Sequence, residues 1–289
     1  MDYRIALDQA TPVSYELDWG TVRGLCWGDP NDIRVVATHG WLDNSHSFLP
    51  LAANWSADRG GLLALDWPGH GHSDHRPTGN YYHFIDYAYD LWQLIEQQGW
   101  QQLILLGHSM GGFVSNVVAA LCPERIKSLI LVEAFGLLVS DGTNAREQLQ
   151  KGFVSRKKLK TPRWRSHSNF DSAVDARAAQ ADFSSDLVKL IVERGSELRS
   201  DGRWHWRADA RVKATSPYRL PSAAVDDLLQ ELTMPVVVVR GSKGYDKLES
   251  ALDKWQHKVS KLSCVTLEGG HHVHMEQPEK IAELLKSHV

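Results

Sequence analysis

One short segment of the sequence has the residues and spacing of a nucleophile. Ser109 is the centre of a Gly-x-Ser-x-Gly motif at 107–111, which follows the apolar run 103–106 and precedes a helix-forming run at 113–121. A serine on a tight strand-to-helix turn adopts a strained backbone, and only glycine-sized neighbours let the chain reverse there. Ser109 is therefore a candidate nucleophile, and the start of the following helix favours negative charge that develops beside it.

The candidate general base lies near the end of the chain. His271 directly follows the glycine pair 269–270, after the last predicted strand. A loop at the carboxyl end of a strand is where open α/β sheets place their chemistry, so His271 can reach back to a nucleophile on an earlier strand. We expect His272 and His274 to pack or hydrogen-bond beside it. His108 is either a titrating neighbour of Ser109 or, as we expect, packs beneath the turn.

These residues need a sheet to position them, and the apolar runs predict one. Nearly continuous Val, Ile and Leu indicate strands buried on both faces, which is typical of a mostly parallel sheet covered by helices. The fold class is therefore α/β, with about eight strands and helices on both faces. The expected strands are residues 33–38, 61–65, 103–106, 128–132, 235–240 and 264–267, with an antiparallel edge hairpin at 15–17 and 22–27.

A long segment separates the strand that ends at residue 132 from the strand that begins near 235. It is much longer than the dozen or so residues that a crossover between parallel strands needs. We therefore predict a helical cap at 136–232, inserted in a core domain made of residues 1–135 and 233–289. The helices expected in this segment are residues 144–160, 171–181, 185–194 and 222–232.

The loop after residues 33–38 is expected to complete the site. In this architecture one oxyanion-hole amide comes from the residue after the nucleophile, here Met110, and the other from this early loop, here Trp41. Losing one such donor typically costs about 3 kcal/mol of transition-state stabilisation.

The cap tryptophans would either close over an apolar substrate or anchor the cap to the core. The candidate substrate-pocket residues are His39, His108, Phe135, Trp204 and Trp206.

Four motifs, in order, span nearly the whole chain. They are the HGWLDN segment at 39–44, the DWPGHGHS segment at 66–73, the glycine-flanked serine at 107–112, and the GHHVHMEQP ending at 270–278. Together they resemble the α/β-hydrolase superfamily, and the first and last look closest to the serine hydrolase-like proteins, relatives of epoxide hydrolases and haloalkane dehalogenases. Those relatives use an aspartate as nucleophile, so Ser109 points instead to acyl chemistry on an ester, thioester, lactone or amide.

The resemblance implies a carboxylate that orients the histidine, and two residues are candidates. The common position of this acid, after the strand 235–240, is occupied here by Gly244, with Asp246 two residues later. Some relatives place the acid after the preceding strand, where this sequence has Glu133. We prefer Glu133 and keep Asp246 as the alternative.

The function implied is that of a carboxylesterase-type serine hydrolase, which forms an acyl-enzyme and needs no cofactor. A non-catalytic ligand receptor on the same scaffold and an acyltransferase are the alternatives. Neither histidine group, at 70–75 or at 271–274, has HExxH spacing, so we expect no metal.

The composition of the chain limits the classes of binding partner that we expect. The 32 basic and 35 acidic residues give a formal charge of −3, with no excess of positive charge for phosphates or anionic lipid. We therefore expect a small-molecule substrate, with neither nucleic acid nor a membrane as partner. The start of the chain does not have the pattern of a secretory signal, and the three scattered cysteines suit buried thiols in a reducing compartment, so a cytoplasmic location is expected. The sequence leaves the oligomeric state open.

Overall fold

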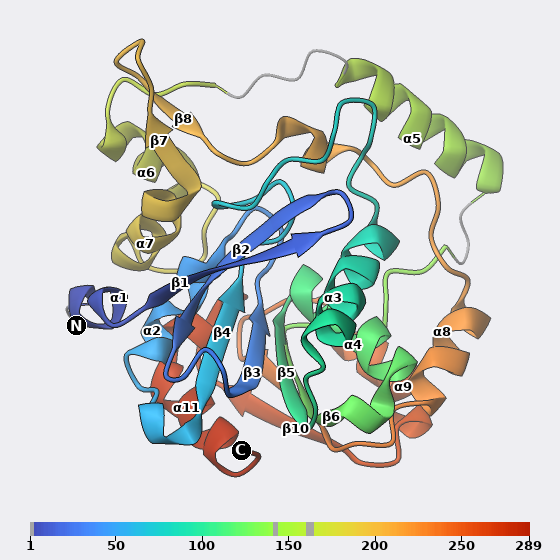
Figure 1. Cartoon of the computed structure of the whole chain (residues 1–289). Coiled ribbons are helices and arrows are strands. Elements are labelled where there is room, and N and C mark those ends of the chain that lie inside the picture. Colours follow the sequence, from blue (N-terminus) through green and yellow to red (C-terminus); the bar gives the residue numbers. More distant parts are fainter. Residues whose placement is uncertain (1–2, 141–143, 160–164) are drawn as a thin grey trace.

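The computed structural model describes residues 3–140, 144–159 and 165–289, and is built around a twisted sheet (Figure 1). The sheet has eight strands in the order β1-β2-β4-β3-β5-β6-β9-β10. Neighbours from β4 to β10 pair in parallel, whereas β2 pairs antiparallel with both β1 and β4. The strands are β1 (Thr11–Leu17), β2 (Gly20–Trp27), β3 (Ile33–Thr38), β4 (Gly61–Leu65), β5 (Leu103–His108), β6 (Ile126–Val132), β9 (Val236–Gly241) and β10 (Leu262–Leu267).

This sheet confirms the predicted fold class, including the edge hairpin, and β3 and β4 have the predicted bounds. The expectation of strands buried on both faces is wrong for β10. That strand is the last in the sheet, and its residues Ser263, Cys264 and Thr266 are exposed. Cys264 is therefore not the buried thiol that we expected, while Cys26 and Cys122 are buried.

Helices cover both faces of the sheet. Because side chains alternate along a strand, Val36 packs into one hydrophobic cluster and its neighbours Val35 and Ala37 into another. The first cluster includes apolar residues of α3, α4, α8 and α9, and the second includes those of α1, α2, α7, α10 and α11. These helices are α1 (Arg4–Asp8), α2 (Leu49–Ala52), α3 (Phe84–Gln98), α4 (Met110–Leu121), α7 (Ser185–Gly195), α8 (Ser222–Gln230), α9 (Lys247–Trp255), α10 (Val273–Glu276) and α11 (Pro278–Lys286). Among the described helices, none combines the length and apolar character that a bilayer-spanning segment requires.

The segment between β6 and β9 contains α5 (Ala145–Lys158), α6 (Phe170–Ala178), α7, the hairpin β7 (Ser196–Leu198) and β8 (Trp204–Trp206), and α8. Figure 1 shows α5, α6 and this hairpin above the sheet. Each predicted helix corresponds to one of these helices, whereas the hairpin was not predicted. Lys160, the last residue of the predicted helix 144–160, lies outside the described residues. Val225 and Leu229 of α8, within the predicted cap segment, pack in the first hydrophobic cluster.

A buried ion pair fixes α7 on the core. Arg194, near the end of α7, lies 2.8 Å from the Asp66 carboxylate, which is fully buried at the end of β4. The backbone amides of Ser45 and His72 also donate to Asp66. Burial alone would raise the pKa of Asp66, but Arg194 and these amides outweigh it and hold the pKa at about 2. The carboxylate at the start of the DWPGHGHS motif is therefore structural.

Candidate active site

Ser109 lies on a strained turn between β5 and α4. Its backbone has φ 50° and ψ −116°, a conformation that costs a residue other than glycine of order 1–3 kcal/mol. The amide of Ser109 donates to the carbonyl of Val132 on β6 at 2.9 Å, and the carbonyl of Ser109 accepts from the amide of Phe113. The elbow is therefore held on both sides, by the sheet and by the first turn of α4.

The glycines around Ser109 are required by close backbone contacts. A Cβ atom on Gly111 would lie 2.1 Å from the Thr38 carbonyl oxygen, and a Cβ on Gly112 would lie 2.6 Å from the Cβ of Ala134. One on Gly107 would lie 2.4 Å from the Cα of Gly112. The turn is thus packed directly against the ends of β3 and β6, which explains why the Gly-x-Ser-x-Gly pattern occurs here.

The structure brings His271 and Glu133 together beside this elbow. The Nδ1 atom of His271 is 3.2 Å from Oε2 of Glu133, and the rings of His271 and His108 have their centroids 4.9 Å apart. The Glu133 side chain is fully buried, whereas that of His271 is 29% exposed and so accessible to a substrate. Among the described residues no hydrogen bond joins Ser109 to His271, and catalytic hydrogen bonds often tighten only when substrate binds.

Glu133 fills the space beside the position where the acid commonly lies. Its carboxylate accepts the amide of Gly241 at 2.7 Å and the amide of Tyr245, and its own backbone has the left-handed φ of 55°. A Cβ atom on Gly244 would lie 2.2 Å and 2.3 Å from the two carboxylate oxygens of Glu133. Because those oxygens occupy that space, residue 244 has room for no side chain.

Asp246, the alternative acid, stands at the start of α9. In the described part of the chain it makes no hydrogen bond or ion pair with His271. The structure therefore brings the preferred candidate, and not the alternative, to the base.

The two expected oxyanion donors belong to adjacent segments. Met110 is the first residue of α4, where backbone amides have no partner within the helix. The Thr38 hydroxyl contacts the Gly111 carbonyl oxygen at 3.1 Å, so the loop that carries Trp41 packs against the start of α4. The Trp41 indole is half exposed and donates to the carbonyl of Val212 in the segment before α8.

A second group of buried polar residues lies behind the base. Asp43 accepts from Nε2 of His272 at 3.0 Å and from Arg177 at 3.0 Å. The Nε2 atom of His108 contacts the carbonyl oxygen of His271 at 2.9 Å, and because a carbonyl can only accept, Nε2 carries the proton. Burial lowers the pKa of His108 to about 4. For His272 burial also lowers the pKa, but Asp43 outweighs it and the pKa is raised.

The sequence analysis expected His272 to pack or hydrogen-bond but did not single out its partner Asp43, although Asp43 belongs to the HGWLDN motif. One ligand atom each from Asp43, His108 and His272 lies within 4.8 Å of the others, a grouping that could hold a metal ion. Arg177 and the His272 N–H already satisfy the Asp43 carboxylate without one. The buried Nδ1 atoms of His108 and His272 have no hydrogen-bond partner among the described residues.

The other expected pocket residues lie in different environments. His39 is fully buried, with Nε2 accepting the Trp67 amide and Nδ1 contacting the Gly40 carbonyl, so neither nitrogen is available to a substrate. His108 and Phe135 are also buried. In the hairpin, the Trp204 ring packs against Phe170 and the Trp206 ring against His167, all within residues 167–206.

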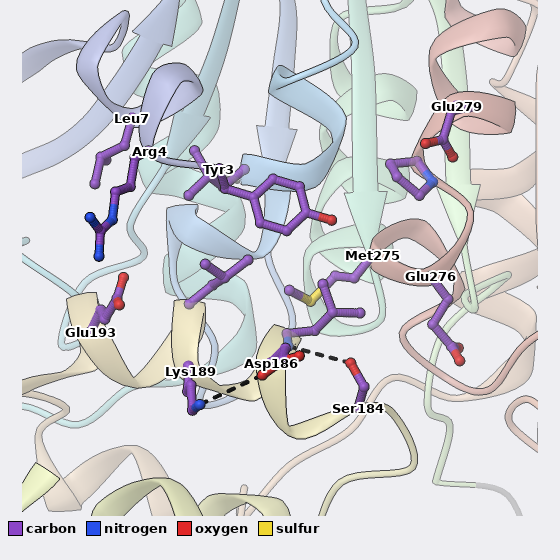
Figure 2. Close-up of a pocket in the computed structure, with 14 residues that line it drawn as sticks. Tyr3, Arg4, Leu7, Ser184, Asp186, Lys189, Glu193, Met275, Glu276 and Glu279 are labelled. Atoms are coloured by element: carbon purple, nitrogen blue, oxygen red, sulfur yellow. Dashed lines mark hydrogen bonds and ion pairs between the residues drawn. The ribbon is translucent and has the colours of Figure 1, made fainter. Parts of the chain in front are cut away.

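A cavity of about 630 Å³ lies elsewhere, between α1, α7 and the segment α10–α11. Figure 2 shows Tyr3, Glu193 and Glu276 around it, on three separate parts of the chain. Neither Ser109 nor His271 lines this cavity. Glu276, which lines this cavity, contacts the segment before His271, because its carboxylate accepts the amide of Gly270 at 2.7 Å.

Comparison with known proteins shows to which family the chain is similar. A serine hydrolase-like protein of Danio rerio is 28% identical over 280 residues, covering 92% of this chain and 84% of that protein. An esterase of Mycobacterium tuberculosis is 25% identical over 276 residues, covering 92% and 86%. The crystal structure of a hypothetical protein of Pseudomonas aeruginosa superimposes with a TM-score of 0.86 at 31% identity, covering 96% and 98%. Residues 33–278 match the family model of the alpha/beta hydrolase fold, and the chain therefore belongs to the α/β-hydrolase family.

Proposed function

We propose that the protein is a carboxylesterase-type serine hydrolase that cleaves an ester-type bond of a small molecule, whether carboxylic ester, thioester, lactone or amide. The observation that carries this proposal is the buried Glu133 carboxylate 3.2 Å from Nδ1 of His271, next to the strained Ser109 elbow. The esterase and the serine hydrolase-like protein that resemble the chain support the same chemistry.

In this mechanism Glu133 fixes the tautomer of His271. The carboxylate holds the proton on Nδ1, which leaves the lone pair of Nε2 free to take the proton of the Ser109 hydroxyl. Ser109 Oγ then attacks the carbonyl carbon of the substrate, and His271 returns the proton to the leaving group. The amides of Met110 and Trp41 hold the oxyanion. His271 then takes a proton from water, whose oxygen attacks the acyl carbon, and returns it to Ser109 Oγ as the bond between Ser109 and the acyl group breaks.

The experiment combines a covalent probe with turnover. The protein is incubated with a fluorophosphonate and, separately, with p-nitrophenyl esters of short acyl chains. We expect labelling and hydrolysis in the wild type, neither in Ser109→Ala, and both in the matched control Ser263→Ala, whose serine is exposed on β10. Saturable ligand binding without hydrolysis, unchanged in Ser109→Ala, would instead identify a receptor and overturn the proposal.

A further inference from the structure

A residue of the proposed cap contacts the backbone of the candidate base. Asp182 lies in the loop between α6 and α7, and its Oδ2 atom accepts the amide N–H of His271 at 2.6 Å. A Cβ atom on Gly270 would lie 2.3 Å from the same oxygen. Gly270, the glycine directly before His271, thus leaves room for a carboxylate that comes from another part of the chain.

The same loop also contacts the buried group of Asp43, His108 and His272. The Oδ1 atom of Asp182 is 3.6 Å from Nδ1 of His272, an ion-pair distance. The Phe183 ring lies over that of His272, with the centroids 4.2 Å apart. At the end of α6, Arg177 forms an ion pair with Asp43, which in turn accepts from His272.

We propose that Asp182 is a positioning residue for the general base, which makes the geometry of His271 depend on the docking of the cap. This inference rests on the proposed function. Three contacts then define the base: the amide of His271 donates to Asp182, its carbonyl accepts from His108, and its ring donates to Glu133. Glu133 and His108 belong to the core, so Asp182 is the contact that responds to the cap.

The contact has a specific kinetic consequence. Asp182 acts on His271 through the backbone amide, so on this inference its loss displaces the base. A misplacement of about 1 Å in a reacting group can cost on the order of 100-fold in rate. We therefore expect an effect on kcat, with KM nearly unchanged.

The test uses two perturbations of one contact. Asp182→Ala removes the acceptor, and Gly270→Ala leaves Asp182 intact but places a methyl group where its carboxylate lies. We expect kcat for a p-nitrophenyl ester to fall by roughly 10- to 100-fold in each. The double variant should be no slower than the slower single variant, because both changes break the same hydrogen bond.

Two further variants separate charge from hydrogen bonding. Asp182→Asn retains an oxygen that can accept from His271 and should keep more activity than Asp182→Ala. Asp186→Asn is the matched control, because this nearby acidic residue of α7 is exposed and pairs with Lys189, so its replacement should leave kcat unchanged.

Proton NMR provides the readout that a purely structural role would not move. The His271 Nδ1–H that donates to Glu133 should give a downfield resonance in the wild type and in Asp186→Asn, and a broadened one in Asp182→Ala. Circular dichroism checks that each variant is folded. A kcat within twofold of wild type in both folded single variants, or a rise in KM alone, overturns the inference; loss of Ser109 dependence would overturn the proposed function instead.

Discussion

Replacing Glu133 tests the assignment of the acid most directly. In Glu133→Gln the side chain keeps its size, but one of its terminal atoms becomes an NH₂ group. The carboxylate now accepts from Gly241, Tyr245 and His271, so the amide must turn its NH₂ toward at least one of these donors. The variant therefore loses both the charge that stabilises the His271 imidazolium and the acceptor pattern that fixes its tautomer.

The size of the effect follows from these two losses. Replacement of the acid in comparable triads lowers kcat by on the order of 10⁴-fold, which corresponds to about 5.4 kcal/mol of transition-state stabilisation. One unpaired buried amide should also cost about 1–3 kcal/mol of folding stability. We expect kcat/KM to fall by roughly 10³- to 10⁴-fold, in a protein that still folds.

The common acid position gives a second, constructive test. Because a Cβ on Gly244 would lie within 2.4 Å of the Glu133 carboxylate atoms, an aspartate there can use that space only after Glu133 is truncated. We expect Glu133→Ala with Gly244→Asp to recover about tenfold in rate over Glu133→Ala alone, and Gly244→Asp alone to impair the wild type. Hydrolysis of a p-nitrophenyl ester measures each. Full turnover in Glu133→Gln, together with its loss in Asp246→Asn, would refute this reasoning.

Three more outcomes follow from the buried charges and histidines. Arg194→Ala should lower the free energy of unfolding by about 3–5 kcal/mol, because it leaves the buried Asp66 carboxylate without its cation. Urea unfolding measures this change, and a loss below about 1 kcal/mol would contradict the expectation. Burial lowers the pKa of His70 from 6.5 to about 3 and that of His108 from 6.5 to about 4. The unfolded chain therefore takes up protons below pH 6.5 that the folded protein does not bind. Folding stability is full above pH 6.5 and is lost as the pH falls toward these two values. Urea unfolding from pH 8 to pH 4 should show this decline, and an unchanged free energy would exclude it. Treatment with a chelator should leave ester hydrolysis unchanged, because Asp43 is already paired with Arg177, and a loss restored by added metal would oppose that view.

Much of the fold could be predicted because its signals are local. The predicted runs of β3 and β4 end where the strands end, and every residue of the two strands except Arg34 is buried, as expected for strands covered on both faces. The hairpin β7–β8 was missed because its strands are only three residues long, too short for a periodic pattern. The exposure of β10 depends on its place at the sheet edge, which the residues of the strand do not reveal.

The site was predictable only where a motif records a backbone requirement. Ser109 is flanked by glycines that the backbone contacts demand, so its place at the elbow is readable from the sequence. The presence of Gly244 reflects the position of Glu133, more than a hundred residues earlier, and could be understood only after the fold had brought the two together. Asp182 gave no signal at all, because an acidic residue in a loop is common and its contact with His271 depends on how α6 and α7 dock.

The location of Glu133 directly after β6 also has a consequence for the order in which the proposed site is assembled. Ser109, Glu133, Met110 and Trp41 all precede the segment that carries α5 to α8, and the base alone follows it. A chain emerging from the ribosome thus contains the nucleophile and the acid long before it contains His271. The proposed activity would require β9 to pair with β6 and β10 with β9, because His271 follows β10, so we expect the site to be completed late in folding.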